Sequence, residues 1–63
     1  MAETEAHRTA RSLIASHGDG ALPIAERAAN NVRTLGMAEK LKFWNAVAAA
    51  IRAIQAGPGS SRA

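Results

Sequence analysis

The 63-residue chain contains no cysteine and no tyrosine, and it has only one tryptophan, one phenylalanine and two prolines. The missing cysteine excludes a disulfide and any cysteine-based metal site, and it is typical of proteins in reducing compartments. No apolar run approaches the ~20 residues that a transmembrane helix needs. The acidic N-terminal segment also lacks the layout of a secretion signal. We therefore expect a soluble, cytoplasmic protein with no membrane association.

Long alternating stretches of apolar and polar residues are missing too, and β-branched residues are sparse, so the sequence predicts no strand. The most frequent residue is alanine, which has the highest intrinsic helix propensity. Composition and pattern together predict an all-α fold.

Apolar residues at spacings of three and four predict three helices, at residues 4–17, 21–35 and 37–56. Their connections are short, which favours antiparallel neighbours. We expect a single domain over residues 1–56, built as a three-helix bundle or as a helical hairpin with a third helix packed across it. The segment 57–63 is rich in Gly, Pro and Ser and is predicted to be a flexible, disordered C-terminal tail.

Local signals mark the helix ends. Thr4 is suited to cap the first helix, and Gly18 and Gly36 are expected to end the first and second helices. Met37 follows the second glycine and supplies no polar side chain to cap the third helix.

The third helix has the strongest apolar periodicity, and Trp44 in it is expected to be the core side chain whose removal costs most stability. The predicted core has eight large apolar residues: Leu13, Ile14, Val32, Leu41, Trp44, Val47, Ile51 and Ile54. This is a thin core. Domains of this size usually recruit a disulfide, a metal or another subunit, and without cysteine we expect a protein partner or a homo-oligomer.

No catalytic or metal-binding constellation is present. His7 and His17 are nearly three helical turns apart and cannot share a metal ion. The hydroxyl and carboxylate residues form no nucleophile–base pair, and the Gly18–Gly20 turn lacks the lysine of a phosphate loop. A chain this small is also expected to lack a ligand pocket of several hundred cubic ångströms. We therefore expect neither an enzyme nor a bound cofactor or metal.

The formal net charge is +3, which permits contact with nucleic acid. Arg8 and Arg11 lie one turn apart in the first helix, and Lys40 and Lys42 lie near the start of the third. A small nucleic-acid-associated regulator binding through these four residues is the alternative hypothesis. Because the basic residues are scattered among acidic ones, a solvated, ion-paired surface is favoured over a nucleic-acid interface.

Phe43 is adjacent to Trp44 and so points about 100° away from it around the helix. If Trp44 faces the core, Phe43 lies at the core's edge or outside it. Phe43 then either covers the margin beside the first helix or anchors a partner, a role in which aromatic residues are enriched. Ala46, Ala50 and Ala53 extend this weakly apolar surface, which could accept another helix.

Several of these residues form a recognisable pattern over roughly residues 6–56: Ala10, Leu13, Ile14, His17, Gly18, Ala21, Gly36, Trp44, Ala50, Ile51, Ile54 and Gln55. The pattern resembles a group of very short bacterial proteins, mostly of unknown function, with an LI–HG–A opening and a G…W…AI..LQ close. The resemblance implies a helical fold and a complete chain, and it brings no site residues. The chain departs from the pattern at Met37, where that group has an acidic cap.

Taken together, the sequence predicts a small helical protein-interaction module. We expect an accessory subunit, an adaptor or a regulator that acts by oligomerisation or by docking on a larger protein.

Overall fold

The computed structural model describes residues 4–56, which fold into three α-helices and no strand. The all-α prediction is therefore confirmed. The helices are α1 (Glu5–His17), α2 (Ala21–Thr34) and α3 (Ala38–Ala56), with a 3₁₀ turn, η1 (Gly18–Gly20), between α1 and α2. The predicted helix ranges differ from these by no more than one residue at either end. The tail predicted at 57–63 lies outside the described residues.

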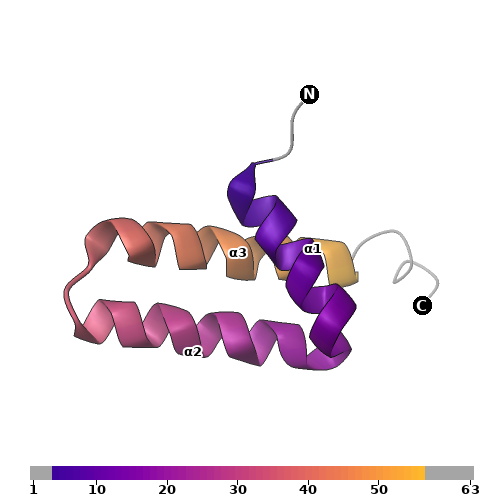
Figure 1. Cartoon of the computed structure of the whole chain (residues 1–63), viewed down its shortest axis with the longest axis horizontal. Coiled ribbons are helices and arrows are strands. Elements are labelled where there is room, and N and C mark those ends of the chain that lie inside the picture. The colour runs from indigo at the N-terminus through magenta and orange to yellow at the C-terminus, as the bar shows by residue number, and fades with distance from the viewer. Residues whose placement is uncertain (1–3, 57–63) are drawn as a thin grey trace.

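α2 and α3 run side by side in opposite directions, and α1 lies across α3 (Figure 1). Of the two predicted architectures, this is the hairpin with a third helix packed across it. Antiparallel packing of successive helices holds for α2 and α3 but not for α1 and α2. The reason is that η1 leads directly into α2 and makes a corner, from which α1 runs over α3 rather than along α2.

The corner depends on the backbone of Gly18. Its φ of 55° and ψ of −121° are the mirror image of extended backbone, which glycine adopts far more easily than any L residue. The Gly18 N–H donates to the Ile14 carbonyl and closes α1. The Gly18 carbonyl accepts a 3.1 Å hydrogen bond from the Gln55 side chain, which ties the end of α3 to the corner.

The other helix ends follow from the sequence. The Thr4 hydroxyl accepts a 3.1 Å hydrogen bond from the His7 N–H and caps α1. Gly36, with a φ of 74°, follows α2, and the next N–H, that of Met37, donates to the Val32 carbonyl at 2.9 Å. The Gly36 N–H donates to the Arg33 backbone carbonyl at 3.1 Å. These two hydrogen bonds form a Schellman motif, which ends α2.

Small side chains make up most of the core. Four of the six buried residues are alanine, and Val47 and Ile51 are the largest that are fully buried: the set is Ala10, Ala21, Ala25, Val47, Ala48 and Ile51. Alanine at these positions lets the three helix axes approach closely. Each of them removes little apolar surface from water, so the core is thinner than the sequence predicted.

The predicted core differs from the observed one in which residues are fully buried and in which side chain matters most. Val47 and Ile51 are buried, and four other predicted residues pack against the core while only partly buried: Leu13, Ile14, Trp44 and Ile54. Val32 and Leu41 are half-buried and lie outside this cluster, toward the α2–α3 connection that α1 does not cover. Because Trp44 stays partly exposed, Ile51 replaces it as the side chain whose removal is expected to cost most.

The buried alanines provide a direct test of this packing. Ala25→Leu adds three carbons where two helices approach closely, and we expect it to lower the free energy of unfolding by about 1–3 kcal/mol. Ala49→Leu makes the same change at an exposed position of α3 and should leave stability nearly unchanged. Urea unfolding followed by circular dichroism compares the two. Equal stabilities would show that the helices do not pack through Ala25.

Alanine substitutions at Gly18 and Gly20 test whether the corner requires the positive φ of Gly18. A Cβ on Gly18 would meet nothing within 4 Å, so any cost of Gly18→Ala comes from its positive φ, and we expect about 1–3 kcal/mol. Gly20 has a φ of −81°, and a Cβ there would lie 3.7 Å from the His17 Cβ, an ordinary contact. Gly20→Ala should be neutral or slightly stabilising. Thermal unfolding measures the stability of both variants. A Gly18→Ala variant more stable than the Gly20→Ala variant would contradict the positive φ at Gly18.

Candidate functional site

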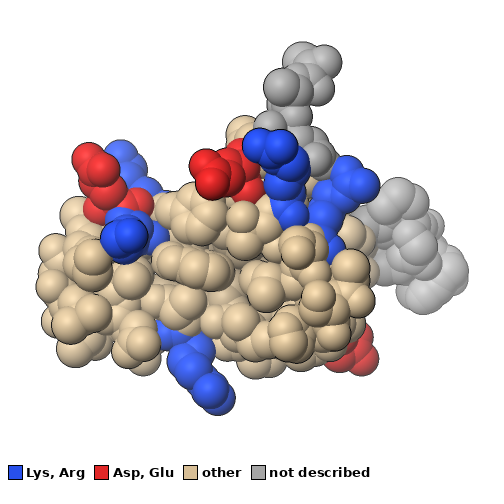
Figure 2. Space-filling view, viewed as in Figure 1, with Lys and Arg blue, Asp and Glu red and all other residues tan. Residues whose placement is uncertain are grey.

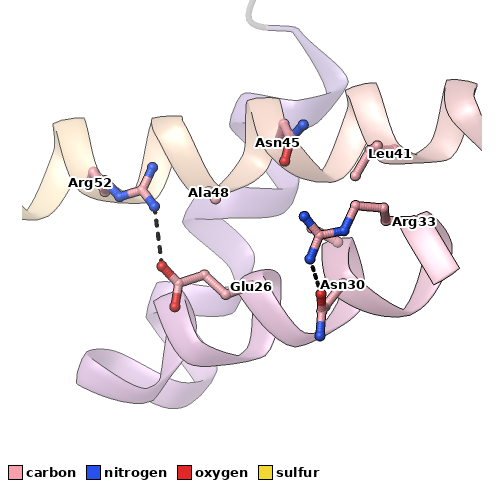
Figure 3. A pocket seen from close by; sticks show the side chains of 8 residues that line it. Glu26, Asn30, Arg33, Leu41, Asn45, Ala48 and Arg52 are labelled. Carbon is pink, nitrogen blue, oxygen red and sulfur yellow. Dashed lines mark hydrogen bonds and ion pairs between the residues drawn. The ribbon is translucent and has the colours of Figure 1, made fainter.

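The face between α2 and α3 carries a polar groove of about 360 Å³. Figure 3 shows arginines from both helices reaching into it. Arg52 of α3 donates to the Glu26 carboxylate of α2 at 3.1 Å, and Arg33 donates to the Asn30 side chain one turn away. The groove is lined by Glu26, Ala29, Asn30, Arg33, Leu41, Asn45, Ala48 and Arg52.

These polar side chains mainly satisfy one another. The Arg52 and Glu26 side chains are 59% and 52% exposed, and an ion pair in such a setting contributes only about 0.2–1 kcal/mol. Glu26 is the one carboxylate in this lining, and its charge is matched by Arg52. The lining therefore supplies no pair of groups for acid–base or nucleophilic chemistry.

A second groove, of about 740 Å³, lies where the start of α1 meets the first turns of α3. Phe43 and Trp44 are half-buried in it, with ring centroids 5.4 Å apart and planes at 82°, an edge-to-face contact. We call this surface the aromatic groove, and its lining is Glu5, Met37, Ala38, Glu39, Lys40, Phe43 and Trp44.

The aromatic groove continues the core face of α3. Lys40, Trp44, Val47 and Ile51 follow one another at spacings of four, three and four, so they lie on one side of the helix. Val47 and Ile51 are buried, whereas Trp44 is only partly covered and Lys40 is exposed. Because α1 crosses α3 mainly further along, only the start of α1, with Glu5, adjoins this side of the first turns.

Two exposed apolar residues lie at the α2–α3 connection, and one of them, Met37, lines the groove. Leu35 is 69% exposed and Met37 is 38% exposed, and these are the exposed large hydrophobic residues of the described chain. Both flank Gly36, where the backbone turns between helices and offers no helical face on which to pack. Their position beside a glycine in an apolar stretch is the signal by which sequence analysis could have found them.

The predicted partner surface is split by the structure. Phe43 and Ala50 are half-buried and pack against the core, whereas Ala46 and Ala53 are exposed. Of the two alternatives for Phe43, the structure has it at the edge of the core near the start of α1, because Phe43 is half-buried, packs against the core and lines the aromatic groove together with Glu5 and Trp44. The sequence prediction missed four members of this site: Glu5, Met37, Ala38 and Glu39.

The four residues of the nucleic-acid hypothesis are all exposed. Arg8 and Arg11 lie on α1, and Lys40 and Lys42 lie in the first turns of α3. Figure 2 shows basic groups separated by acidic and uncharged surface on the visible face. Arg8, Arg11, Lys40 and Lys42 are therefore distributed over two helices, and Lys40 belongs to the aromatic groove.

Within residues 4–56, no three His, Asp or Glu side chains are grouped so that they could hold a metal ion. No helix in this same range is long and apolar enough to cross a membrane. The expectation that so small a chain lacks a pocket of several hundred cubic ångströms is wrong, because two open grooves of that size occur on its surface.

No protein-family model matches this chain, and no curated protein or solved structure is significantly similar to it. The resemblance to very short bacterial proteins therefore stays a prediction that depends on its motif residues.

The partial burial of Phe43 determines how much stability the Phe43→Ala variant is expected to lose. A fully buried phenylalanine costs about 3–5 kcal/mol when truncated to alanine. Phe43 is half-buried, so we expect about 1–2 kcal/mol, together with a red shift in the emission of Trp44, the only tryptophan. Chemical unfolding and fluorescence measure both effects. A loss as large as that of Ile51→Ala would mean that Phe43 is a core residue.

Proposed function

We propose that this chain is a small helical protein-interaction module, an accessory subunit, adaptor or regulator that acts by oligomerisation or by docking on a larger protein. One observation carries the proposal. Alanines make up most of the buried core, while the largest apolar side chains lie partly exposed together around the aromatic groove.

The energetic argument follows from these placements. Apolar surface gains about 25 cal/mol per Å² when it leaves water, and Phe43, Trp44, Leu35 and Met37 retain such surface in the free chain. Aromatic side chains and methionine are also enriched at the centres of protein interfaces. A partner seated on the groove would therefore add apolar burial that the chain's own core lacks.

The proposal assigns the chain no catalytic step and no cofactor, since neither groove collects the groups that such chemistry needs. The cytoplasm is the proposed location, on the basis of the cysteine-free composition.

Sedimentation equilibrium of the full chain across the micromolar range tests the proposal. We expect the average mass to rise with concentration, the unfolding midpoint to rise with it, and the Trp44 emission to shift to shorter wavelength as the groove is covered. If docking on a larger protein is the function instead, one protein should be recovered by the wild type and lost with Met37→Ser.

A chain that stays monomeric, keeps one emission maximum and recovers no such protein would contradict the proposed function. A shift of duplex DNA in a low-salt gel, abolished by salt, would instead favour the nucleic-acid hypothesis for Arg8, Arg11, Lys40 and Lys42.

A further inference from the structure

We infer that the aromatic groove receives a basic segment of a partner protein, with a lysine or arginine side chain lying over the Phe43–Trp44 pair and its charged head beside Glu5 and Glu39. The inference rests on the proposed function and gives the chemistry of the partner. It is carried by the geometry of the two rings and by a groove charge opposite in sign to that of the whole chain.

The two rings form an apolar surface that also attracts positive charge. Their planes meet at 82° with the centroids 5.4 Å apart, so the pair bounds a corner whose two sides are ring faces. The face of an aromatic ring carries negative partial charge and attracts ammonium and guanidinium groups. Both rings are only half-buried and both line the groove, so part of each stays accessible there.

The charged residues of the groove favour a cation. Glu5 of α1 and Glu39 of α3 line it together with one basic residue, Lys40, so two negative charges and one positive charge give the lining a net charge of −1. The whole chain has a formal net charge of +3. Both glutamates are exposed, and within residues 4–56 neither forms an ion pair. An incoming cation therefore meets carboxylates that no group of the described chain neutralises.

Lysine and arginine side chains match this combination of surfaces. Each has an apolar stem that packs along apolar groups and a charged head that stays in water. Met37, Phe43 and Trp44 supply apolar contacts for the stem, while the two carboxylates come from different helices and supply acceptors for the head. An acidic segment would be repelled by the same two carboxylates.

The exposure of these groups sets the expected strength. Ion pairs between exposed side chains are weak. The groove is lined by seven residues, fewer than the ~20–30 residues that each side of a standard interface contributes. We therefore expect a short basic peptide to bind with a dissociation constant on the order of 100 μM at low ionic strength, and more weakly as added salt screens the charges.

Titration of the full chain with a short capped peptide of lysine and arginine spaced by glycine tests the chemistry. Trp44, the only tryptophan, reports binding through its emission. The control peptide carries norleucine and citrulline instead, which keep the stems and remove the charges, and it should bind about tenfold more weakly. Equal binding of the two peptides, or no saturable binding of the basic one, overturns the inference.

Substitutions in the groove test its residues. E5Q/E39Q removes both carboxylates and should raise the dissociation constant of the basic peptide about tenfold. K40Q removes the competing positive charge and should lower the constant about threefold. F43L keeps an apolar side chain but removes a ring face, and it should weaken binding about threefold.

Matched controls make the same charge changes outside the aromatic groove. D19N/E26Q removes two exposed carboxylates and K42Q removes an exposed lysine, and each should leave the constant within about twofold of wild type. Glu5 and Glu39 also lie in the first turns of their helices, where negative charge is favourable, so circular dichroism checks that every variant is folded. Equal effects of K42Q and K40Q would show that total charge controls binding, which overturns the inference.

The outcomes separate this inference from the proposed function. A chain that ignores the basic peptide but recovers a protein that Met37→Ser loses is still an interaction module, and its partner has another chemistry. Self-association that excludes the peptide identifies a second copy as the occupant and likewise overturns the inference alone. A chain that binds the peptide as expected, yet neither self-associates nor recovers a protein, supports the cation site and contradicts the proposed function.

Discussion

The close approach of three helices through buried alanines is the constraint on which the rest of the structure depends. Ala10 of α1, Ala21 and Ala25 of α2, and Ala48 of α3 are all buried, and each replaces a side chain that would hold the helices apart. Close packing of this kind gains dispersion contacts between backbones, but it buries little apolar area per residue. The same choice of residue that lets the helices touch therefore leaves the core small and keeps the larger apolar groups at its edges.

The direction of α1 determines which edge stays open. Gly18 turns the chain at the corner, and Gln55 holds the Gly18 carbonyl, so α1 crosses α3 over its later turns. Val47 and Ile51 are buried beneath this crossing, while Trp44, one step earlier on the same face, is only partly covered. A helix running along α2 and α3 would have closed that face. The open side of the aromatic groove thus follows from the backbone conformation at Gly18, which precedes Phe43 by roughly 80–90 Å of fully extended chain.

The helices were predictable from sequence because their ends depend on local chemistry. Thr4 caps with its own hydroxyl, and Gly18 and Gly36 supply positive φ where helices stop. The depth of burial was not predictable in the same way, because periodicity identifies a face but not the distance to the next helix. Trp44 and Ala48 are one turn apart on the inward side of α3, yet Ala48 is buried while Trp44, nearer the end that α1 does not cross, is only partly buried. For the site, Phe43 could be named in advance, while Glu5 joins it only through the crossing of α1.

If the chain acts through the aromatic groove as proposed, its stability and its association are coupled. The groove and the core are two parts of one face of α3, so an occupant of the groove packs on the same Trp44 ring that contacts the core from its other side. Anything that binds the folded chain and not the unfolded chain stabilises it in proportion to its occupancy. A variant that thins the core therefore also weakens the surface on which the proposed partner packs.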